Sequence, residues 1–429
     1  MCIICDTTDI NTIIHMTTLS CKHCKNLTKI PKELVNLTRI ELMFCDNLSE
    51  ISNELVNLTH ISIFQSNILQ EIPKELVNLT HLSIIDNILI TEIPKELVKL
   101  TTLEYILHDI LPSKIRNYTG NSYLYSGLKR IPTEFINLTT LICKGCNEIT
   151  EIPKELVNLT ELVCDYSPNL KELPKELVNL KKLECCYCPN ITEIPKELVN
   201  LEYLRCGHCP NIKEIPKELV KLEYLNCEHC DITPFGIPKE LNKLKSLNCV
   251  YCPNLKEIPK ELVNLEYLNC RSSNLKEIPK ELINLRQLDC DFCKYLEKIP
   301  RQLVNLRSIH CSYCDKLIYI PNIPNLAEIY CKYIFVICST TEKSEIVNSQ
   351  PYNNLIYCPE PPIYYQSTFA YENRLKMIED NYVNYRKKGC KKLHDTIFEE
   401  LIQRTWHPSR VIDWCWDEDE KKFMNGMLI

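Results

Sequence analysis

The sequence predicts an α/β repeat fold: a solenoid with a parallel, concave β-sheet on one side and short turns or 3₁₀ turns on the convex side. The first observation is the phrase Ile-Pro-Lys-Glu-Leu-Val-Asn-Leu, which recurs along most of the 429 residues. The second is the spacing of its copies, which is 21 residues in most cases. The third is the alternation of apolar and polar residues between copies, which is typical of strands. A unit this short cannot bury its own apolar face, so neighbouring units must stack.

A proline anchors nearly every copy of the phrase. The anchors are Pro31, Pro73, Pro94, Pro132, Pro153, Pro174, Pro195, Pro216, Pro238, Pro259, Pro279, Pro300 and Pro321, and Ser52 takes the proline position once. The spacing between Pro94 and Pro132 is 38 residues, and Leu111-Pro112 inside this gap indicates a degenerate unit. We therefore expect irregular units at residues 103–130, which in a solenoid mark a bend, an insertion or the decay of a unit.

The unit from 201 to 221 illustrates how one repeat is expected to fold. Leu204 and Cys206 occupy alternate positions of a short strand, and both point toward the core. Cys209 then turns the chain. Pro216 fixes φ and removes a hydrogen-bond donor, which suits an extended or 3₁₀ segment better than a ladder strand. Residues 217–220 form a short helical turn at most, so each unit contributes one strand and one turn.

The same unit matches the pattern LxxLxLxxN/CxL and resembles the leucine-rich repeats of 20–22 residues. Residues 58–73 also resemble the related FNIP-type repeat. Together with the tail sequence WHPxRxxDWC at 406–415, the chain resembles the repeat proteins encoded in large sets by giant DNA viruses of amoebae. The resemblance implies a solenoid over about residues 1–335 and protein binding in general, without a named partner.

CxxC pairs recur along the chain. They are Cys2/Cys5, Cys21/Cys24, Cys143/Cys146, Cys185/Cys188, Cys206/Cys209, Cys227/Cys230, Cys249/Cys252, Cys290/Cys293 and Cys311/Cys314. Their first cysteine falls on an inward strand position and their second on the turn position of the repeat. Ile63 and Ile84 replace the first, and Ser167 and Ser273 replace the second. A position that accepts isoleucine is a packing position, so we assign the cysteines from Cys185 to Cys252 a structural role as reduced, buried thiols.

Two other interpretations of the cysteines stay open. CxxC pairs are typical of zinc sites, and His23, His208 and His229 lie inside such pairs, where each could add a ligand. Tyr187 and Tyr251 take the same place elsewhere, which favours an exposed ring over a metal ligand. Stacked cysteines about 4.8 Å apart could also form disulfides, but parallel Cβ vectors and a reducing cytosol disfavour them. We expect no metal and no cofactor.

The outward strand residues in the middle of the array are the expected binding surface, because the concave sheet is where solenoids usually bind partners. The candidate residues are Tyr203, Arg205, Tyr224, Asn226, Asn248, Tyr267, Asn269, Arg271 and Asp289. Tyr203, Tyr224 and Tyr267 share one register and are the predicted anchors, since tyrosine and arginine are frequent hot-spot residues. The asparagines form a second column, which could instead satisfy itself through an amide ladder. A generic solvated face is the alternative.

The 21-residue repeat pattern ends after Cys331, and the composition changes. Residues 336–368 carry Pro351, Pro359, Pro361 and Pro362 and are expected to form a linker or a segment that wraps the end of the solenoid. Residues 369–429 show helical spacing and hold the tryptophans Trp406, Trp414 and Trp416. This part is expected to be a helical cap or a docking module.

Composition excludes several function classes. Only 7 glycines occur, and no GxGxxG or GxxxxGK loop can be built from them. The net charge of −6 offers no basic footprint for nucleic acid, and no apolar run is long enough to span a membrane. Without a signal peptide, we expect a cytoplasmic protein that is not secreted. Cys415 and Asp417 resemble the CxD pattern of bacterial leucine-rich-repeat ubiquitin ligases, but the catalytic parts of those enzymes are far larger than this tail.

We therefore expect a non-catalytic interaction scaffold that binds an unknown protein, possibly a host protein, on its concave surface. One alternative is a substrate adaptor for a ubiquitin ligase, which would act through the tail. The other is a zinc-binding repeat protein.

Overall fold

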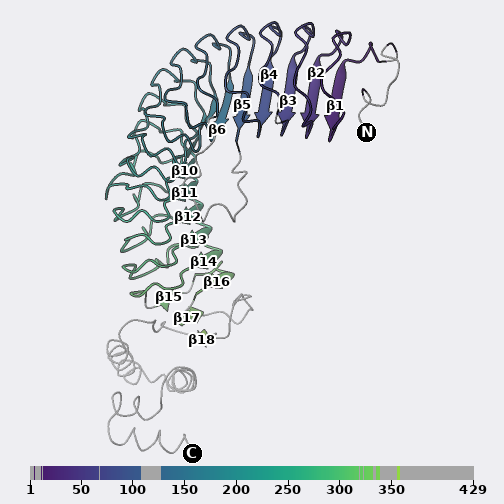
Figure 1. The fold of residues 1–429 in the computed structure, drawn as a ribbon. Coiled ribbons are helices and arrows are strands. Elements are labelled where there is room, and N and C mark those ends of the chain that lie inside the picture. The colour runs from purple at the N-terminus through teal and green to yellow at the C-terminus, as the bar shows by residue number, and fades with distance from the viewer. Residues whose placement is uncertain are drawn as a thin grey trace, which may run out of the picture. The chain divides into compact units, whose positions relative to one another are not determined.

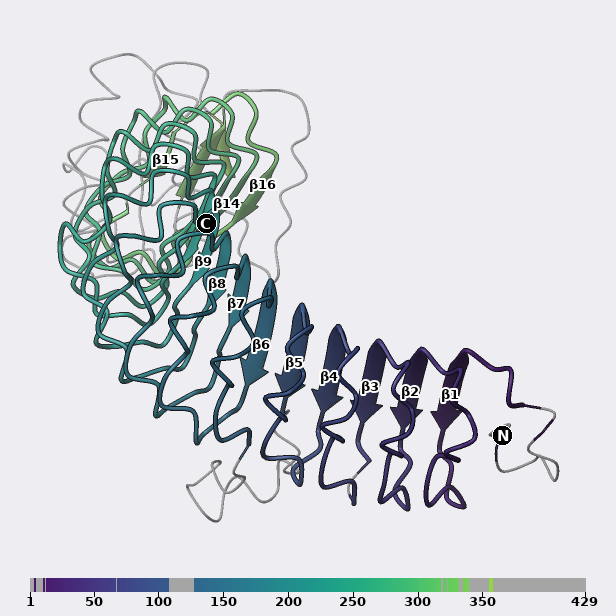
Figure 2. The ribbon, with the colours of Figure 1, turned by 90° about the horizontal axis from the view of Figure 1, so that it is seen from above.

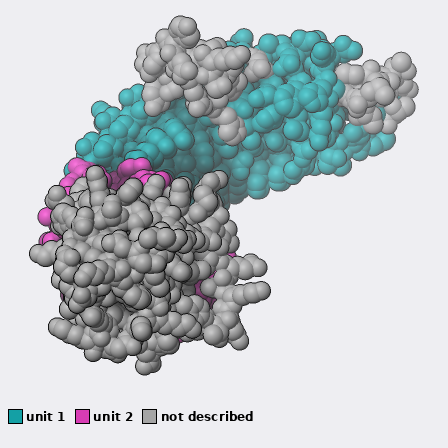
Figure 3. All heavy atoms as spheres, turned by 90° about the horizontal axis from the view of Figure 1, so that it is seen from below, with its two compact units in different colours: residues 1–230 teal, residues 231–429 magenta. Residues whose placement is uncertain are grey.

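The computed structural model describes residues 4, 11, 13–66, 68–107, 127–317, 319–321, 323–331, 335–338 and 355–357. The chain divides into two compact units, Met1–Cys230 and Asp231–Ile429, which are called unit 1 and unit 2 (Figure 3). Among the described residues, fifteen parallel strands follow one another in sequence order in the main sheet. This arrangement is the predicted solenoid with a parallel sheet.

Unit 1 contains the first ten strands, and each forms one side of a coil whose opposite side is made of turns (Figures 1 and 2). They are β1 Thr18–Lys22, β2 Arg39–Met43, β3 His60–Phe64, β4 His81–Ile85, β5 Thr102–Ile106, β6 Thr140–Lys144, β7 Glu161–Val163, β8 Lys182–Glu184, β9 Tyr203–Arg205 and β10 Tyr224–Asn226. Equivalent residues of successive coils pair directly, as Tyr203 does with Tyr224. The outward side chains of each register position therefore form columns.

Unit 2 continues the same pattern. Its strands in the main sheet are β11 Ser246–Asn248, β12 Tyr267–Asn269, β13 Gln287–Asp289, β14 Ser308–His310 and β16 Glu328–Tyr330. A separate sheet of three parallel strands holds β15 Tyr319–Ile320, β17 Phe335–Cys338 and β18 Leu355–Tyr357. Since β17 and β18 pair with each other and β17 pairs with β15, parts of the predicted linker segment form strands beside the last coils.

The core of each coil consists of stacked leucine, isoleucine and cysteine side chains. In the coil that begins at Leu201, the residues Leu204, Cys206, Cys209 and Ile212 have no exposed surface. The same positions are buried in the neighbouring coils, so every coil completes its core with the next one. The convex side is built of consecutive turns, in which Leu219 N donates to Pro216 O at 3.2 Å and Leu222 N donates to Leu219 O at 3.0 Å.

Polar side chains of the repeat phrase tie each coil to the one before it. Asn158 Nδ2 donates to the backbone oxygen of Ile136 at 2.9 Å, and Thr160 Oγ1 donates to that of Thr139 at 3.1 Å. Other asparagines and threonines of the phrase in unit 1 repeat these bonds, among them Asn57, Asn78, Asn179, Asn200, Thr59, Thr80 and Thr101. The recurring Asn-Leu-Thr sequence therefore has a structural reason within the coil.

The degenerate unit expected around Leu111-Pro112 falls between β5 and β6, in residues 108–126, which lie outside the described part of the chain. Strand β5 pairs directly with β6, so Thr102 lies beside Thr140 although 38 residues separate them. The hydrogen bonds between coils also connect the two sides of this gap, since Thr139 Oγ1 donates to Thr101 O at 3.1 Å. The coils of β5 and β6 are therefore neighbours in the described sheet.

Several predictions concern residues outside the described part of the chain. These are the pair Cys2/Cys5, the irregular residues 108–126 and the helical region 369–429 with its tryptophans. The described residues contain no helix with the length and apolar character needed to cross a membrane.

Candidate functional site

The predicted anchors Tyr203 and Tyr224 lie side by side on the outward face of β9 and β10. Their rings are stacked with centroids 4.3 Å apart and planes 5° from parallel. Burial, the neighbouring Tyr224 and Glu184 raise the pKa of Tyr203 to about 12, so the Tyr203 hydroxyl remains protonated at neutral pH. The pair is half-buried and held in place by its neighbours, and it presents a rigid aromatic edge to solvent.

A buried carboxylate organises the charges next to this pair. Glu184 on β8 has a side chain that is only 8% exposed, and it contacts Lys182 at 3.0 Å and Arg205 at 3.1 Å. Lys182 also pairs with Glu161 at 2.8 Å, and its ammonium lies 5.6 Å from the centroid of the Tyr203 ring. Arg205, which the sequence predicted as a binding residue, therefore forms an ion pair with Glu184.

The network extends to β6. Lys144 pairs with Asp165 at 3.2 Å and lies 4.0 Å from Glu184, and the Asp165 side chain is 6% exposed. Asp165 also accepts a hydrogen bond from the backbone N of Cys186 at 2.8 Å. Five residues of this network were not predicted from the sequence: Lys144, Glu161, Asp165, Lys182 and Glu184. A signal for them was present, because outward positions 21 residues apart carry opposite charges in the pairs Lys144/Asp165, Glu161/Lys182 and Glu184/Arg205. We call Lys144, Glu161, Asp165, Lys182, Glu184, Tyr203, Arg205 and Tyr224 the strand-face cluster.

The residues of the asparagine column accept hydrogen bonds from the backbone of the turn that follows each strand. Asn226 is only 4% exposed, and its Oδ1 accepts a hydrogen bond from Glu228 N at 2.9 Å. Asn248 and Asn269 accept the bond from the residue two positions on at 3.3 Å, and Asp289 does the same with Asp291 N. Such local bonds turn the chain at the end of the strand. Among these residues, Asn226 is the least accessible to a partner.

Unit 2 carries the remaining predicted residues. Tyr267 pairs in register with Ser246 on one side and Gln287 on the other, so no aromatic residue stands beside it in its own column. The guanidinium of Arg271 lies 5.0 Å from the centroid of the Phe292 ring, and its buried Nε has no hydrogen-bond partner in the described structure.

The residue directly before the turn position adopts a left-handed backbone in many of the described coils. Tyr166, Tyr187, His208 and His229 have φ between 54° and 59°, which is uncommon for residues other than glycine. Their rings stack in order, with centroids 4.5, 4.1 and 4.2 Å apart. His23 and Phe44 form a similar stack at 4.5 Å. The histidines of the CxHC sequences therefore belong to an aromatic column along the edge of the sheet.

The predicted structural cysteines are buried free thiols. The cysteines at the turn position also donate hydrogen bonds to the preceding coil. Cys209 Sγ donates to Cys185 O at 3.0 Å, Cys188 Sγ to Cys164 O at 3.2 Å, and Cys230 Sγ to Cys206 O at 3.0 Å. Asn87 occupies the same position in an earlier coil, and its Nδ2 donates to Ser66 O at 2.7 Å. Cysteine and asparagine at this position therefore both donate to the preceding coil, but to carbonyls three residues apart.

Burial and their hydrogen bonds raise the pKa of thiols at the strand position. The hydrogen bond with Cys230 and burial hold the pKa of Cys206 well above its usual value, and Cys185 is affected in the same way through Cys209. A protonated, buried thiol is a poor nucleophile and a poor metal ligand. Within the described residues, no group of three or more His, Cys, Asp or Glu side chains is arranged to hold a metal ion.

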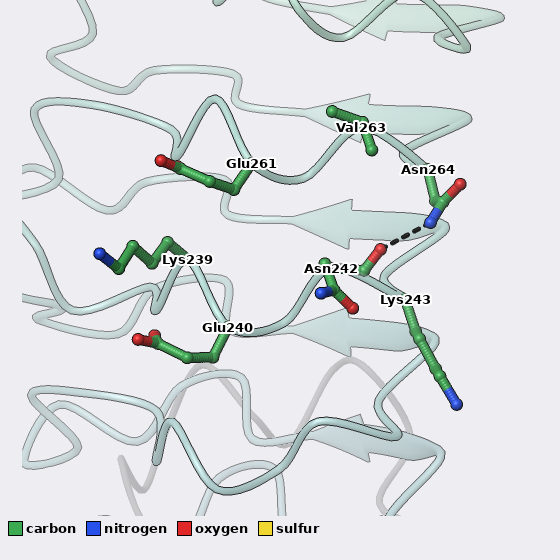
Figure 4. A pocket seen from close by; sticks show the side chains of 7 residues that line it. All are labelled: Lys239, Glu240, Asn242, Lys243, Glu261, Val263 and Asn264. Carbon is green, nitrogen blue, oxygen red and sulfur yellow. Dashed lines mark hydrogen bonds between the residues drawn. The ribbon is translucent and has the colours of Figure 1, made fainter.

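A groove on the turn side of unit 2 carries no catalytic constellation (Figure 4). It is lined by Lys239, Glu240, Asn242, Lys243, Glu261, Val263 and Asn264. Asn264 Nδ2 donates to Asn242 O at 2.7 Å across it, which is the ordinary bond between coils. The groove lies where Asn242 takes the place of the valine that neighbouring coils expose.

Solved structures with a similar fold are leucine-rich repeat proteins. One from Leptospira interrogans is 23% identical, with a TM-score of 0.53, and the match covers 72% of this chain and 87% of that one. The functional domain of InlJ from Listeria monocytogenes, which includes a cysteine ladder, is 20% identical with a TM-score of 0.52. That match covers 77% of this chain and 65% of the InlJ chain, less than two thirds of its length. No protein-family model and no curated protein sequence matches the chain. The chain therefore has the fold of the leucine-rich repeat proteins.

Proposed function

We propose that this protein is a non-catalytic scaffold that binds a partner protein through the strand-face cluster of unit 1. The observation that carries the proposal is the stacked pair Tyr203 and Tyr224 beside the buried carboxylate of Glu184. An aromatic pair already fixed by its neighbours loses little conformational entropy when a partner covers it. Tyrosine edges flanked by charged groups are also typical of binding hot spots.

The charges of the cluster shape the expected partner. Three cations and three carboxylates compensate one another, so the cluster has no net charge with which to attract a strongly charged ligand. The partner surface is therefore expected to be largely uncharged, with apolar or amide groups against the tyrosine rings. The resemblance to repeat proteins of giant viruses makes a host protein in the cytoplasm the proposed partner.

The experiment compares three forms of the full chain in quantitative pull-downs from amoeba lysate. The double variant Tyr203→Ala/Tyr224→Ala removes the aromatic pair, while Val199→Ala/Val220→Ala removes two exposed side chains from the turn side of the same coils. Circular dichroism and the thermal midpoint verify that both variants fold. We expect partners to be lost with the tyrosine variant alone. Retention of every partner by the tyrosine variant would reject this surface.

The ubiquitin-ligase adaptor rests on residues 369–429, which lie outside the described part of the chain. No described contact favours it over the scaffold. Deletion of 369–429 provides its test, since an adaptor would lose ligase components in the same pull-down while a scaffold would keep its partner.

A further inference from the structure

A second group of outward residues lies on β3 and β4, away from the strand-face cluster. His60 and His81 pair in register on these neighbouring strands. Their rings are stacked with centroids 4.2 Å apart and planes 10° from parallel. His60 is partly exposed and His81 is exposed, so both reach the solvent on the strand face.

The threonine that precedes each histidine fixes its tautomer. Thr59 Oγ1 lies 3.0 Å from Thr38 O and 2.8 Å from His60 Nδ1. A hydroxyl has a single proton, and the carbonyl oxygen can only accept. Thr59 therefore donates to the carbonyl, and His60 Nδ1 must carry a hydrogen that it donates to Thr59. The same geometry holds at Thr80, which lies 3.0 Å from Thr59 O and 2.9 Å from His81 Nδ1.

These threonine hydroxyls donate to the preceding coil because of the repeat structure and not because a histidine ring is present. Thr38, Thr101, Thr139 and Thr160 donate to the preceding coil in the same way, although no histidine follows them. In the neutral imidazole a hydrogen on Nδ1 leaves the lone pair on Nε2. The two neighbouring histidines thus each carry an unprotonated Nε2, and both belong to rings on the strand face.

We propose that His60 and His81 together bind one divalent transition-metal ion through their Nε2 atoms. Metal-binding histidines almost always donate the other ring N–H to an oxygen, as both rings do here. Imidazole ligands suit Zn²⁺, Cu²⁺ and Ni²⁺, and the two nitrogens on one such ion lie about 3 Å apart for bonds of about 2.0–2.1 Å. Because the stacked rings point their Nε2 lone pairs side by side, one ion is bound when both rings rotate out of the 4.2 Å stack until the two lone pairs converge on it. Water completes the coordination.

The surrounding charges permit a cation at this position. Arg39, the cation in the adjacent position of β2, is neutralised by Glu41 at 2.8 Å. On the other side Thr102 is uncharged, and Glu104 accepts a hydrogen bond from Ser83 at 2.8 Å. Two protein ligands give a weak, exchangeable site, which leaves positions on the metal that a partner's side chain can fill.

The test titrates untagged full-length protein with Cu²⁺, Ni²⁺ or Zn²⁺ alone by calorimetry, and follows bound Cu²⁺ by electron paramagnetic resonance. We expect one ion per chain with two coordinated imidazole nitrogens. The variant His60→Gln/His81→Gln should weaken binding at least tenfold, while His208→Gln/His229→Gln, which removes the other stacked pair, should leave it unchanged. Equal loss in both variants, or unchanged binding in the first, would mean an adventitious ion only and would overturn the site.

A further variant examines the role of the hydroxyl. Thr80→Val keeps the size of the side chain but removes the acceptor that fixes the His81 tautomer. We expect Cu²⁺ affinity to fall about 10-fold or more, as is usual when an outer partner of a metal-binding histidine is lost. Unaltered affinity in a folded Thr80→Val protein would contradict the tautomer argument. The metal should also raise the thermal midpoint of the parent protein but not that of His60→Gln/His81→Gln.

Discussion

The thiol of Cys209 donates a hydrogen bond to the backbone oxygen of Cys185 in the preceding coil, at 3.0 Å. In an earlier coil, Asn87 holds the same position, but it donates to Ser66 O at 2.7 Å, a carbonyl three residues further along that coil, and it also accepts from Leu89 N at 3.1 Å. The turn position therefore accepts two kinds of small buried donor, which reach different carbonyls of the preceding coil.

This requirement predicts an order among substitutions at Cys209. Cys209→Asn should preserve stability better than Cys209→Val, although valine is the more apolar residue. Asparagine can donate to Cys188 O, as Asn87 donates to Ser66 O, whereas valine leaves the turn position without any donor to the preceding coil. The loss of a buried hydrogen bond costs about 1–3 kcal/mol. Thermal and urea unfolding of the two variants provide the measurement, and a valine variant as stable as the asparagine variant would contradict the donor role.

The burial of the stacked cysteines also predicts which thiols react. Cys331 is partly exposed, and the hydrogen bond with Cys311 lowers its pKa, so it should react faster than the buried thiols whose pKa is raised. Cys206 and Cys209 are fully buried and should stay unmodified until the protein unfolds. Brief alkylation followed by peptide mass spectrometry measures the difference. Equal labelling of Cys331 and Cys206 in the folded protein would show that the ladder opens readily.

Glu184 is expected to matter more than its neighbour Glu161. Glu184→Gln removes the charge that Lys182 and Arg205 share, and it should destabilise unit 1 by about 1–3 kcal/mol. Glu161→Gln is the matched control, because that side chain is 31% exposed and its single pair with Lys182 contributes less than about 1 kcal/mol. Equal thermal midpoints for the two variants would contradict the central role of Glu184.

The left-handed position of Tyr187 predicts another contrast. Tyr187 has φ 58°, where glycine is relaxed and a β-branched residue is strained. Tyr187→Gly loses stacking of about 0.5–1.5 kcal/mol but relieves about 1–2 kcal/mol of backbone strain, so its stability should change little. Tyr187→Val loses the stacking and adds strain. The glycine variant should therefore melt at the higher temperature, and the reverse order would refute the backbone argument.

Lowering the pH should destabilise the protein through His208. Burial and His229 lower the pKa of His208 from its usual 6.5, so the unfolded chain binds the proton more tightly. The contribution of His208 to the free energy of unfolding is present above pH 6.5 and is lost as the pH falls through the lowered pKa. His208→Gln should flatten the dependence of the urea midpoint between pH 7.5 and pH 5. An identical slope in parent and variant would assign the effect to other groups.

The sequence predicted the features that depend on one coil. The positions of the repeat prolines, the inward strand positions and the burial of Cys206 and Cys209 all follow from the pattern of a single unit. What it did not predict depends on neighbouring coils or on backbone geometry. Glu184 becomes central only because Lys182 and Arg205 stand beside it on adjacent strands. The left-handed φ of Tyr187 gave no sequence signal, because glycine is absent from most of these positions.

The candidate site was predicted in part. Tyr203 and Tyr224 do stack on the strand face, but Asn226 is buried and Arg205 is bound to Glu184. Outward direction in a strand pattern does not establish accessibility, since a side chain can be covered by its neighbours in the column. Whether these residues bind a partner stays a prediction.

The bonds from asparagine, threonine and turn-position cysteine give the array a direction. Asn158, Thr160 and Cys209 all donate to a coil that lies earlier in the chain. Because a ribosome synthesises the N-terminus first, each emerging coil brings donors to acceptors that already exist. The protein can therefore assemble one coil at a time during translation, with every completed coil serving as the template for the next.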